Sequence, residues 1–123
     1  MIKEDYCDFE IAKLLKEKGF DEPCYMAYVP TNRKHIMRND AGHSNSMHPD
    51  DYYAVPTLQM AMKWLRKIYG IDIVIEISDP SVKDRKYYCV IWDGNNNSHI
   101  LDLFNSNEEA CEAAIKYCLE NLI

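Results

Sequence analysis

A helix that leads directly into a strand, over residues 56–77, constrains the fold of this chain more than any other feature. Thr57 is a good N-cap residue, and Gly70 is a good residue for the helix end. Between them the apolar residues repeat with helical spacing; they are Leu58, Ala61, Met62, Leu65, Ile68 and Tyr69. After Gly70 the period changes to two, with an isoleucine at every odd position from 71 to 77. Such alternation is typical of a strand with one buried face and favours an antiparallel sheet.

Two further elements are predicted before this segment. A helix over residues 8–18 is followed by Gly19, which allows a left-handed exit from the last turn. A short apolar run over residues 24–29 is a candidate strand, which Pro30 ends or confines to a sheet edge.

Three elements are predicted after it. Residues 87–93 and 100–104 have the composition of strands, and the turn-forming segment 93–97 joins them. Ser106 and Glu109 form a capping box, from which a last helix runs almost to the C-terminus.

These patterns predict an α+β fold, with a small, mostly antiparallel sheet of three to four strands and three helices packed chiefly on one face. The 123 residues have room for one domain. We therefore expect a single domain over residues 1–123, with a long irregular loop at about 31–55, where clear periodicity is lost. The expected core centres on Leu15, Leu58, Leu65, Ile73, Ile75, Ile91, Ile115 and Leu119.

The cysteines and the apolar runs bear on the compartment. The chain has five cysteines, an odd number, and none lies in a C-x-x-C pair. No charged segment followed by an apolar run marks a secretory signal, and no apolar stretch reaches the roughly 18 residues of a membrane span. We expect a cytoplasmic protein that does not enter a membrane, with buried, reduced thiols.

Three segments carry a resemblance to a known family. The segments PTLQMAMKWLR (56–66) and EEACEAAIKYCLENLI (108–123) resemble a family of short uncharacterised proteins of Bacteroides-type gut bacteria and their phages or mobile elements. The segment FEIAKLLKEKGF (9–20) is similar to the opening helix of that family. The resemblance implies one small domain of phage or mobile-element origin, and it implies no activity, cofactor or catalytic residue.

The predicted loop contains residue types that bind metals. His35, His43 and His48 lie there, together with Asp40, Asp50 and Asp51. Their spacing matches no zinc finger, and a long loop loses conformational entropy when it gathers ligands. We interpret them as ordinary polar residues. The alternative is a small metal-dependent enzyme, or a thiol enzyme that pairs Cys24 or Cys89 with one of these histidines. No phosphate-binding motif is present, and no cofactor is predicted.

Basic residues form three groups along the chain: Lys63, Arg66 and Lys67; Arg33, Lys34 and Arg38; and Lys83, Arg85 and Lys86. If they converge, they could hold phosphates, which makes weak nucleic-acid binding a second alternative. The net charge of −6 argues against it.

Aromatic residues are more numerous than one sheet face needs. Tyr88 and Trp92 share one side of the predicted strand 87–93, and Tyr52 and Tyr53 close the loop. Helices on both faces of the sheet would make the strand residues core, which we favour; without such cover they would form a partner surface. The leading functional hypothesis is an accessory or adaptor protein that binds a protein partner or itself through Tyr52, Tyr53, Tyr88 and Trp92.

Overall fold

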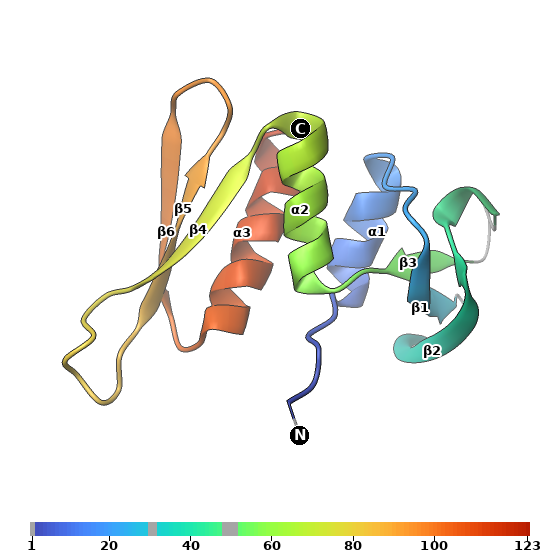
Figure 1. Ribbon diagram of the computed structural model, residues 1–123, viewed down its shortest axis with the longest axis horizontal. Helices are drawn as coiled ribbons and strands as arrows, with labels where there is room; N and C mark the ends of the chain where they lie inside the picture. The colour runs from blue at the N-terminus through green and yellow to red at the C-terminus, as the bar shows by residue number, and fades with distance from the viewer. Residues whose placement is uncertain (1, 30–31, 48–51) are drawn as a thin grey trace. The chain divides into compact units, whose positions relative to one another are not determined.

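The computed structural model of the chain describes residues 2–29, 32–47 and 52–123, with only the backbone described for 32–41. The chain divides into two compact units, Met1–Met60 and Ala61–Ile123. Secondary structure confirms the α+β class, with three α-helices and two antiparallel sheets of three strands among the described residues (Figure 1). The single domain over residues 1–123 stays a prediction.

Unit 1 begins with helix α1 (Phe9–Glu17), as predicted. The Asp8 side chain accepts a hydrogen bond from the backbone nitrogen of Ile11 at 2.9 Å and so caps the helix. At the other end Gly19 has a φ of 91°, and the backbone nitrogen of the buried Phe20 donates to the Leu15 carbonyl at 2.9 Å. These contacts fix both ends of the helix, and its buried residues include Leu15.

The first sheet has the strand order β2-β1-β3, built from β1 (Cys24–Val29), β2 (Asn32–His43) and β3 (Tyr53–Val55). Helix α1 lies against β3 (Figure 1). The short 3-10 helix η1 (Asn45–Met47) follows β2. This arrangement corrects the predicted irregular loop, because residues 32–43 form a strand paired with β1. Hydrogen bonds to a neighbouring strand stabilise an extended backbone whatever its side chains are. Such a strand therefore need not show the alternation of apolar and polar residues by which strands are recognised in a sequence.

A short segment near the N-terminus is fixed by backbone pairing within unit 1. The Cys7 nitrogen donates to the Pro56 carbonyl at 3.0 Å, and the Leu58 nitrogen donates to the Asp5 carbonyl at 2.9 Å. Tyr6 and Thr57 form an antiparallel bridge between these two bonds. The start of the chain is therefore tied to the residues that precede the central helix.

Helix α2 (Leu58–Tyr69) begins in unit 1 and continues into unit 2. Thr57 caps it as predicted, because its hydroxyl accepts a hydrogen bond from the Met60 nitrogen at 3.1 Å. Gly70 ends it with a φ of 68°. Leu65 is fully buried, whereas Ile68, assigned to the apolar stripe from the sequence, is exposed.

Unit 2 contains the second sheet, with the strand order β4-β5-β6, built from β4 (Asp72–Ile77), β5 (Tyr87–Trp92) and β6 (Ser98–Phe104). Helix α3 (Asn107–Asn121) contacts all three strands and lies along one side of the sheet (Figure 1). Ser106 caps it as predicted, because the Glu109 nitrogen donates to the Ser106 hydroxyl. The Glu109 carboxylate accepts from the Asn105 nitrogen, one residue before the nitrogen that a capping box uses.

Two parts of the predicted architecture need correction or stay open. The sheet of three to four strands is replaced by two sheets, because β1 pairs only with its neighbours in unit 1 and β4 pairs with β5 in unit 2. Packing of three helices on one face is not shown, since α1 lies against β3 and α3 against the second sheet. The expected core is largely confirmed; Leu15, Leu58, Leu65, Ile91, Ile115 and Leu119 are buried, while Ile73 and Ile75 are half-buried.

Candidate functional site

The second sheet has one covered and one uncovered side. Cys89 and Ile91 in β5 are fully buried, and α3 lies on their side of the sheet. Because side chains alternate along a strand, Tyr88, Val90 and Trp92 lie on the opposite side. In the strand register Val90 is paired with Val74 on β4 and with Ile100 on β6. These three side chains form an apolar row across the sheet.

The uncovered side is exposed to solvent at its two edges and at one end. The exposed fraction is 40% for Val74, 63% for Ile100 and 47% for Trp92. We call the surface formed by Val74, Tyr88, Val90, Trp92 and Ile100 the open face. Exposed apolar patches of this kind, when they include aromatic residues, are typical of surfaces that bind other proteins.

The edge of the open face along β4 is acidic. Asp72 is paired with Trp92 and Glu76 with Tyr88, so both carboxylates lie on the open side of the sheet, and both are exposed. The three strands of this sheet contain no lysine or arginine. The open face therefore combines an apolar centre with two carboxylates along its β4 edge, and Asp102 is a further exposed carboxylate on β6.

The predicted partner-surface residues are divided between the two units. Tyr88 and Trp92 are on the open face. Tyr52 and Tyr53 belong to unit 1, where Tyr52 is buried and the Tyr53 ring packs edge-on against Phe9, with centroids 5.2 Å apart. Burial removes Tyr52 as a surface residue, because its side chain already fills the interior of unit 1.

The histidine-rich segment is described only in part. His35 lies in β2, where only the backbone is described, His43 ends that strand, and His48 lies outside the described residues. Among the described residues, no three His, Cys, Asp or Glu side chains are grouped closely enough to hold a metal ion. The metal-site hypothesis stays a prediction.

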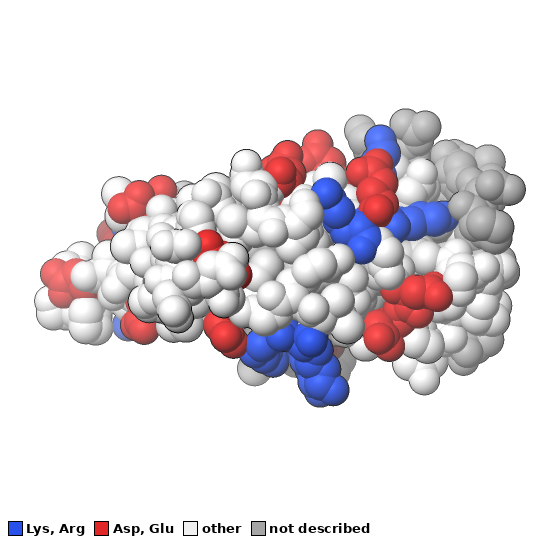
Figure 2. Space-filling model, turned by 90° about the horizontal axis from the view of Figure 1, so that it is seen from above, with Lys and Arg blue, Asp and Glu red and all other residues white. Residues whose placement is uncertain are grey.

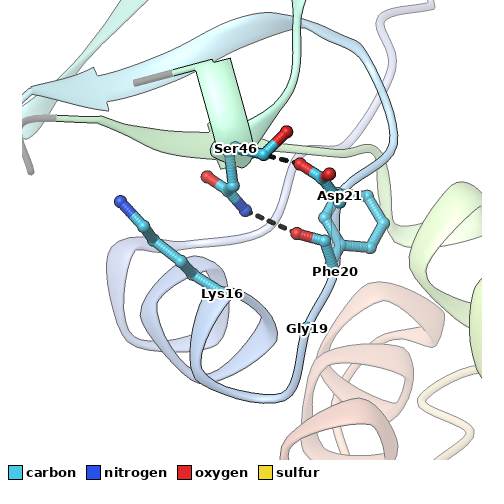
Figure 3. Close-up of a pocket in the computed structure, with 6 residues that line it drawn as sticks. Lys16, Gly19, Phe20, Asp21 and Ser46 are labelled. Carbon is cyan, nitrogen blue, oxygen red and sulfur yellow. Dashed lines mark hydrogen bonds between the residues drawn. The ribbon is translucent and has the colours of Figure 1, made fainter. Parts of the chain in front are cut away.

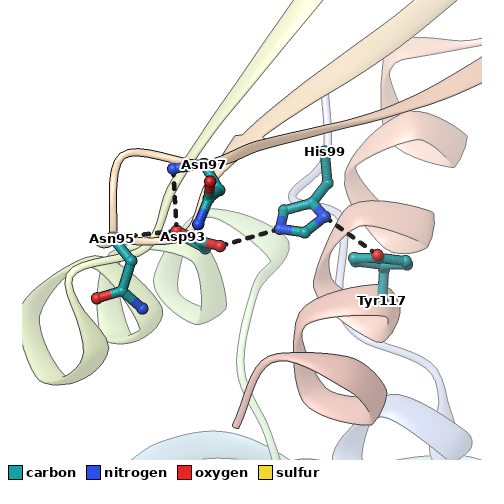
Figure 4. Close-up of polar contacts among 5 residues, drawn as sticks. All are labelled: Asp93, Asn95, Asn97, His99 and Tyr117. Atoms are coloured by element: carbon teal, nitrogen blue, oxygen red, sulfur yellow. Dashed lines mark hydrogen bonds and ion pairs between the residues drawn. The ribbon is translucent and has the colours of Figure 1, made fainter.

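The fourth histidine, which the sequence analysis did not single out, belongs to a polar cluster (Figure 4). His99 Nε2 is 3.0 Å from Asp93 Oδ2, and the Tyr117 hydroxyl is 3.3 Å from His99 Nδ1. The other oxygen of Asp93 accepts hydrogen bonds from the backbone nitrogens of Asn95 and Asn97. The hydrogen bond from His99 and these backbone donors hold the pKa of Asp93 below its ordinary value.

This cluster connects the β5–β6 turn to α3. Both ring nitrogens of His99 are engaged, one by the turn and one by Tyr117 on the helix. The contacts fit a structural connection within unit 2. A sequence signal for it exists, since Asp93 begins the turn after β5 and His99 lies near the start of β6.

The burial of the cysteines indicates that they have a structural role. All five cysteines are buried thiols. Burial raises the pKa of Cys24 and of Cys118 to about 12, and it raises the pKa of Cys89 above its ordinary value. Because the thiolate is the nucleophile, these values disfavour the thiol-enzyme alternative for Cys24 and Cys89.

An open pocket of about 330 Å³ lies in unit 1, between the end of α1 and η1 (Figure 3). The polar groups that line it make hydrogen bonds within the protein. Asn45 donates from Nδ2 to the Phe20 carbonyl at 2.8 Å and accepts from the Ala54 nitrogen at 2.8 Å, and Asp21 accepts from the Ser46 nitrogen at 2.6 Å. Lys16 donates to the Tyr52 carbonyl at 2.6 Å. These bonds join η1 to residues 20–21 after α1 and to β3, and each polar side chain named here already has a hydrogen-bond partner within unit 1.

Acidic and basic side chains are intermixed on the surface. On the face shown in Figure 2, lysine and arginine form small groups interspersed with aspartate and glutamate. The side chains of Arg33, Lys34 and Arg38 are not described, and Lys86 donates to the Asn105 side chain. Nothing in this distribution adds support to nucleic-acid binding, which stays a prediction.

None of the helices in the described part of the chain combines the length and the apolar content that crossing a membrane requires. Comparison of the chain with protein-family models, with curated proteins and with solved structures finds no match.

Proposed function

We propose that this chain is an accessory or adaptor protein that binds a partner protein through the open face. The observation that carries the proposal is the apolar row of Val74, Val90 and Ile100 beside the exposed Trp92. Water contact with these side chains is unfavourable, and a partner that covers them gains about 25 cal/mol for each Å² of apolar surface removed from water. Trp and Tyr are also enriched at the energetically important centres of interfaces.

The proposal modifies the hypothesis drawn from the sequence. It retains Tyr88 and Trp92 and adds Val74, Val90 and Ile100. It drops the buried Tyr52 and also Tyr53, because both belong to unit 1. A cytoplasmic location and a phage or mobile-element origin belong to the same proposal. The location is supported by the five buried thiols, and the origin by the family resemblance of residues 9–20, 56–66 and 108–123.

The test is affinity capture from a host lysate with three forms of the protein. The native chain is compared with Trp92→Ser/Ile100→Ser, which removes two exposed apolar side chains from the open face. The matched control is Ile68→Ser/Val82→Ser, which removes two apolar side chains of 59% and 46% exposure that lie outside that face. Circular dichroism and thermal unfolding are used to check that all three forms are folded.

We expect that a protein from the lysate binds to the native chain and to the control variant but not to the open-face variant. Retention of the same proteins by all three forms would contradict the proposal. The native mass of the isolated chain is measured in parallel, because a dimer that the open-face variant converts to a monomer would identify a second copy as the partner.

A further inference from the structure

We propose that the open face binds a single amphipathic helix of a partner protein, with lysine or arginine along the side of that helix that lies over β4. This inference rests on the proposed function and names the kind of partner. It follows from the size of the open face, from its charge and from the way α3 already covers the other side of the sheet.

The size of the open face matches one helix. Three neighbouring strands span about 10 Å across the sheet, and a helix with its side chains is about 10–12 Å wide. β4 and β5 each have six residues, which makes them about 20 Å long. A helix of roughly 13 residues covers that length.

Helix α3 shows that this packing is feasible on the same sheet. It has 15 residues and by itself contacts β4, β5 and β6 on the covered side. A second helix on the open face would complete a three-layer arrangement with a helix on each side of the sheet, which is a stable way to bury both apolar faces.

The negative charge along β4 favours a partner helix with basic side chains. Asp72 and Glu76 lie four residues apart on β4, or about 13 Å along the strand. Basic residues seven to eleven positions apart on one side of a helix are about 10–16 Å apart and can reach both carboxylates. Such pairs at the rim of an interface add specificity and speed association.

A second copy of this chain is a poor occupant. β4, β5 and β6 contain no lysine or arginine, and Lys86, which directly precedes β5, already donates to the Asn105 side chain, so the open face of a second copy would bring little positive charge to Asp72 or Glu76. Face-to-face pairing about an axis across the strands would instead place Asp72 of one copy over Glu76 of the other. Like charges held together across an interface oppose association.

The test uses two synthetic 15-residue helical peptides with the same leucine stripe. One carries lysine along one margin of the stripe, and the other carries glutamate at the same positions. Binding is measured by titration with detection of backbone amide shifts, which locates the peptide on the protein. The protein forms are the native chain, Asp72→Lys/Glu76→Lys, and Asp84→Lys/Glu120→Lys as a control with the same change of net charge at exposed positions away from the open face.

We expect the lysine peptide to bind the native chain roughly tenfold more tightly than the glutamate peptide at low salt and to shift the amides of Val74, Val90 and Ile100. The preference should invert in Asp72→Lys/Glu76→Lys and persist in the control. Equal affinity for both peptides, absence of binding, shifts elsewhere, or equal effects of the two charge reversals would overturn the inference.

Failure of this inference is separable from failure of the proposed function. Consider a partner, identified by lysate capture, whose binding requires Trp92 and Ile100. If that partner binds Asp72→Lys/Glu76→Lys as well as it binds the native chain, the proposed function stands, and only the inference of a basic helix is overturned. A dimer that depends on Trp92 and Ile100 also overturns it, because the occupant is then a second copy.

Discussion

Val90 in β5 lies directly opposite Ile100 in β6, on the side of the sheet that α3 does not cover. In a sheet with helices on both sides this pair would be core, and here Ile100 is among the most exposed apolar side chains of the described residues. The pair is closely followed along the strands by Trp92 opposite Ser98. The two sides of the sheet β4-β5-β6 therefore differ in their cover: one is buried under α3, and the other leaves apolar side chains exposed to solvent.

Leu65 tests the central helix. Leu65→Ala should lower the free energy of unfolding by about 2–5 kcal/mol, because it removes a fully buried side chain and leaves a cavity. Ile68→Ala, on an exposed position of the same helix, should change it by about 0.5 kcal/mol or less. Denaturant unfolding measures both, and a change of 1 kcal/mol or less for Leu65→Ala would contradict the assignment.

Asn45 tests the connection within unit 1. Its buried side chain joins the Phe20 carbonyl to the Ala54 nitrogen, so Asn45→Ala leaves both backbone groups unsatisfied. We expect a loss of about 1–3 kcal/mol in the free energy of unfolding. Ser46→Ala is the control in the same 3-10 helix, because it keeps the backbone nitrogen from which Asp21 accepts and removes only the exposed Ser46 hydroxyl, which contacts Ser44 and Asp21. A loss of about 0.5 kcal/mol or less for Asn45→Ala would show that the Asn45 side chain is dispensable.

Asp93 gives a pH dependence with a definite sign. Its pKa is lowered in the folded chain, so its contribution to stability is present above the ordinary value of 3.8 and is lost as the pH falls through the lowered pKa. Asp93→Asn should be less stable than the native chain at pH 7, and the difference should shrink as the pH falls below 3.8.

Unfolding curves of the two proteins over a pH series measure this difference, with Asp84→Asn in the exposed hairpin as the control. A difference between native protein and Asp93→Asn that stays constant down to the acid limit would contradict the role given to the carboxylate.

The cysteines should react slowly in the folded protein. Cys24 and Cys118 have pKa values of about 12, and all five thiols are buried. Because alkylation requires the thiolate and access to it, a thiol reagent at pH 8 should label the native chain slowly and label all five cysteines after denaturation. Rapid labelling of Cys24 or Cys89 in the native protein would restore the thiol-enzyme alternative.

Local signals in the sequence predicted most of the secondary structure. Asp8, Thr57 and Ser106 act as helix caps in the structure, and each precedes an apolar pattern with helical spacing. Caps and periodicity are properties of neighbouring residues, so one sequence is enough to find them.

Pairing between distant segments was harder to predict. Strand β2 shows no alternating apolar pattern in the sequence, and it is recognised only by the pairing of its backbone with β1. The division into two sheets was missed for the same reason, since periodicity identifies strands without naming their partners.

Only part of the candidate site was predicted from the sequence. Alternation placed Tyr88 and Trp92 on one side of β5, but whether a helix covers that side depends on the path of α3, which no local pattern determines. Val74 and Ile100 joined the surface only through the register of β4 and β6 with β5. Tyr52 was included as an aromatic residue at the end of the predicted loop, and its burial follows from tertiary packing.

The most direct measurement of the central claim is oxidative footprinting of the complex that the native chain forms with its captured partner. Trp92 and Met47, which are 47% and 58% exposed, should both be oxidised in the isolated chain. In the complex we predict that Trp92 is protected while Met47, in unit 1, is oxidised as before. Equal oxidation of Trp92 in the complex and in the isolated chain would contradict binding through the open face.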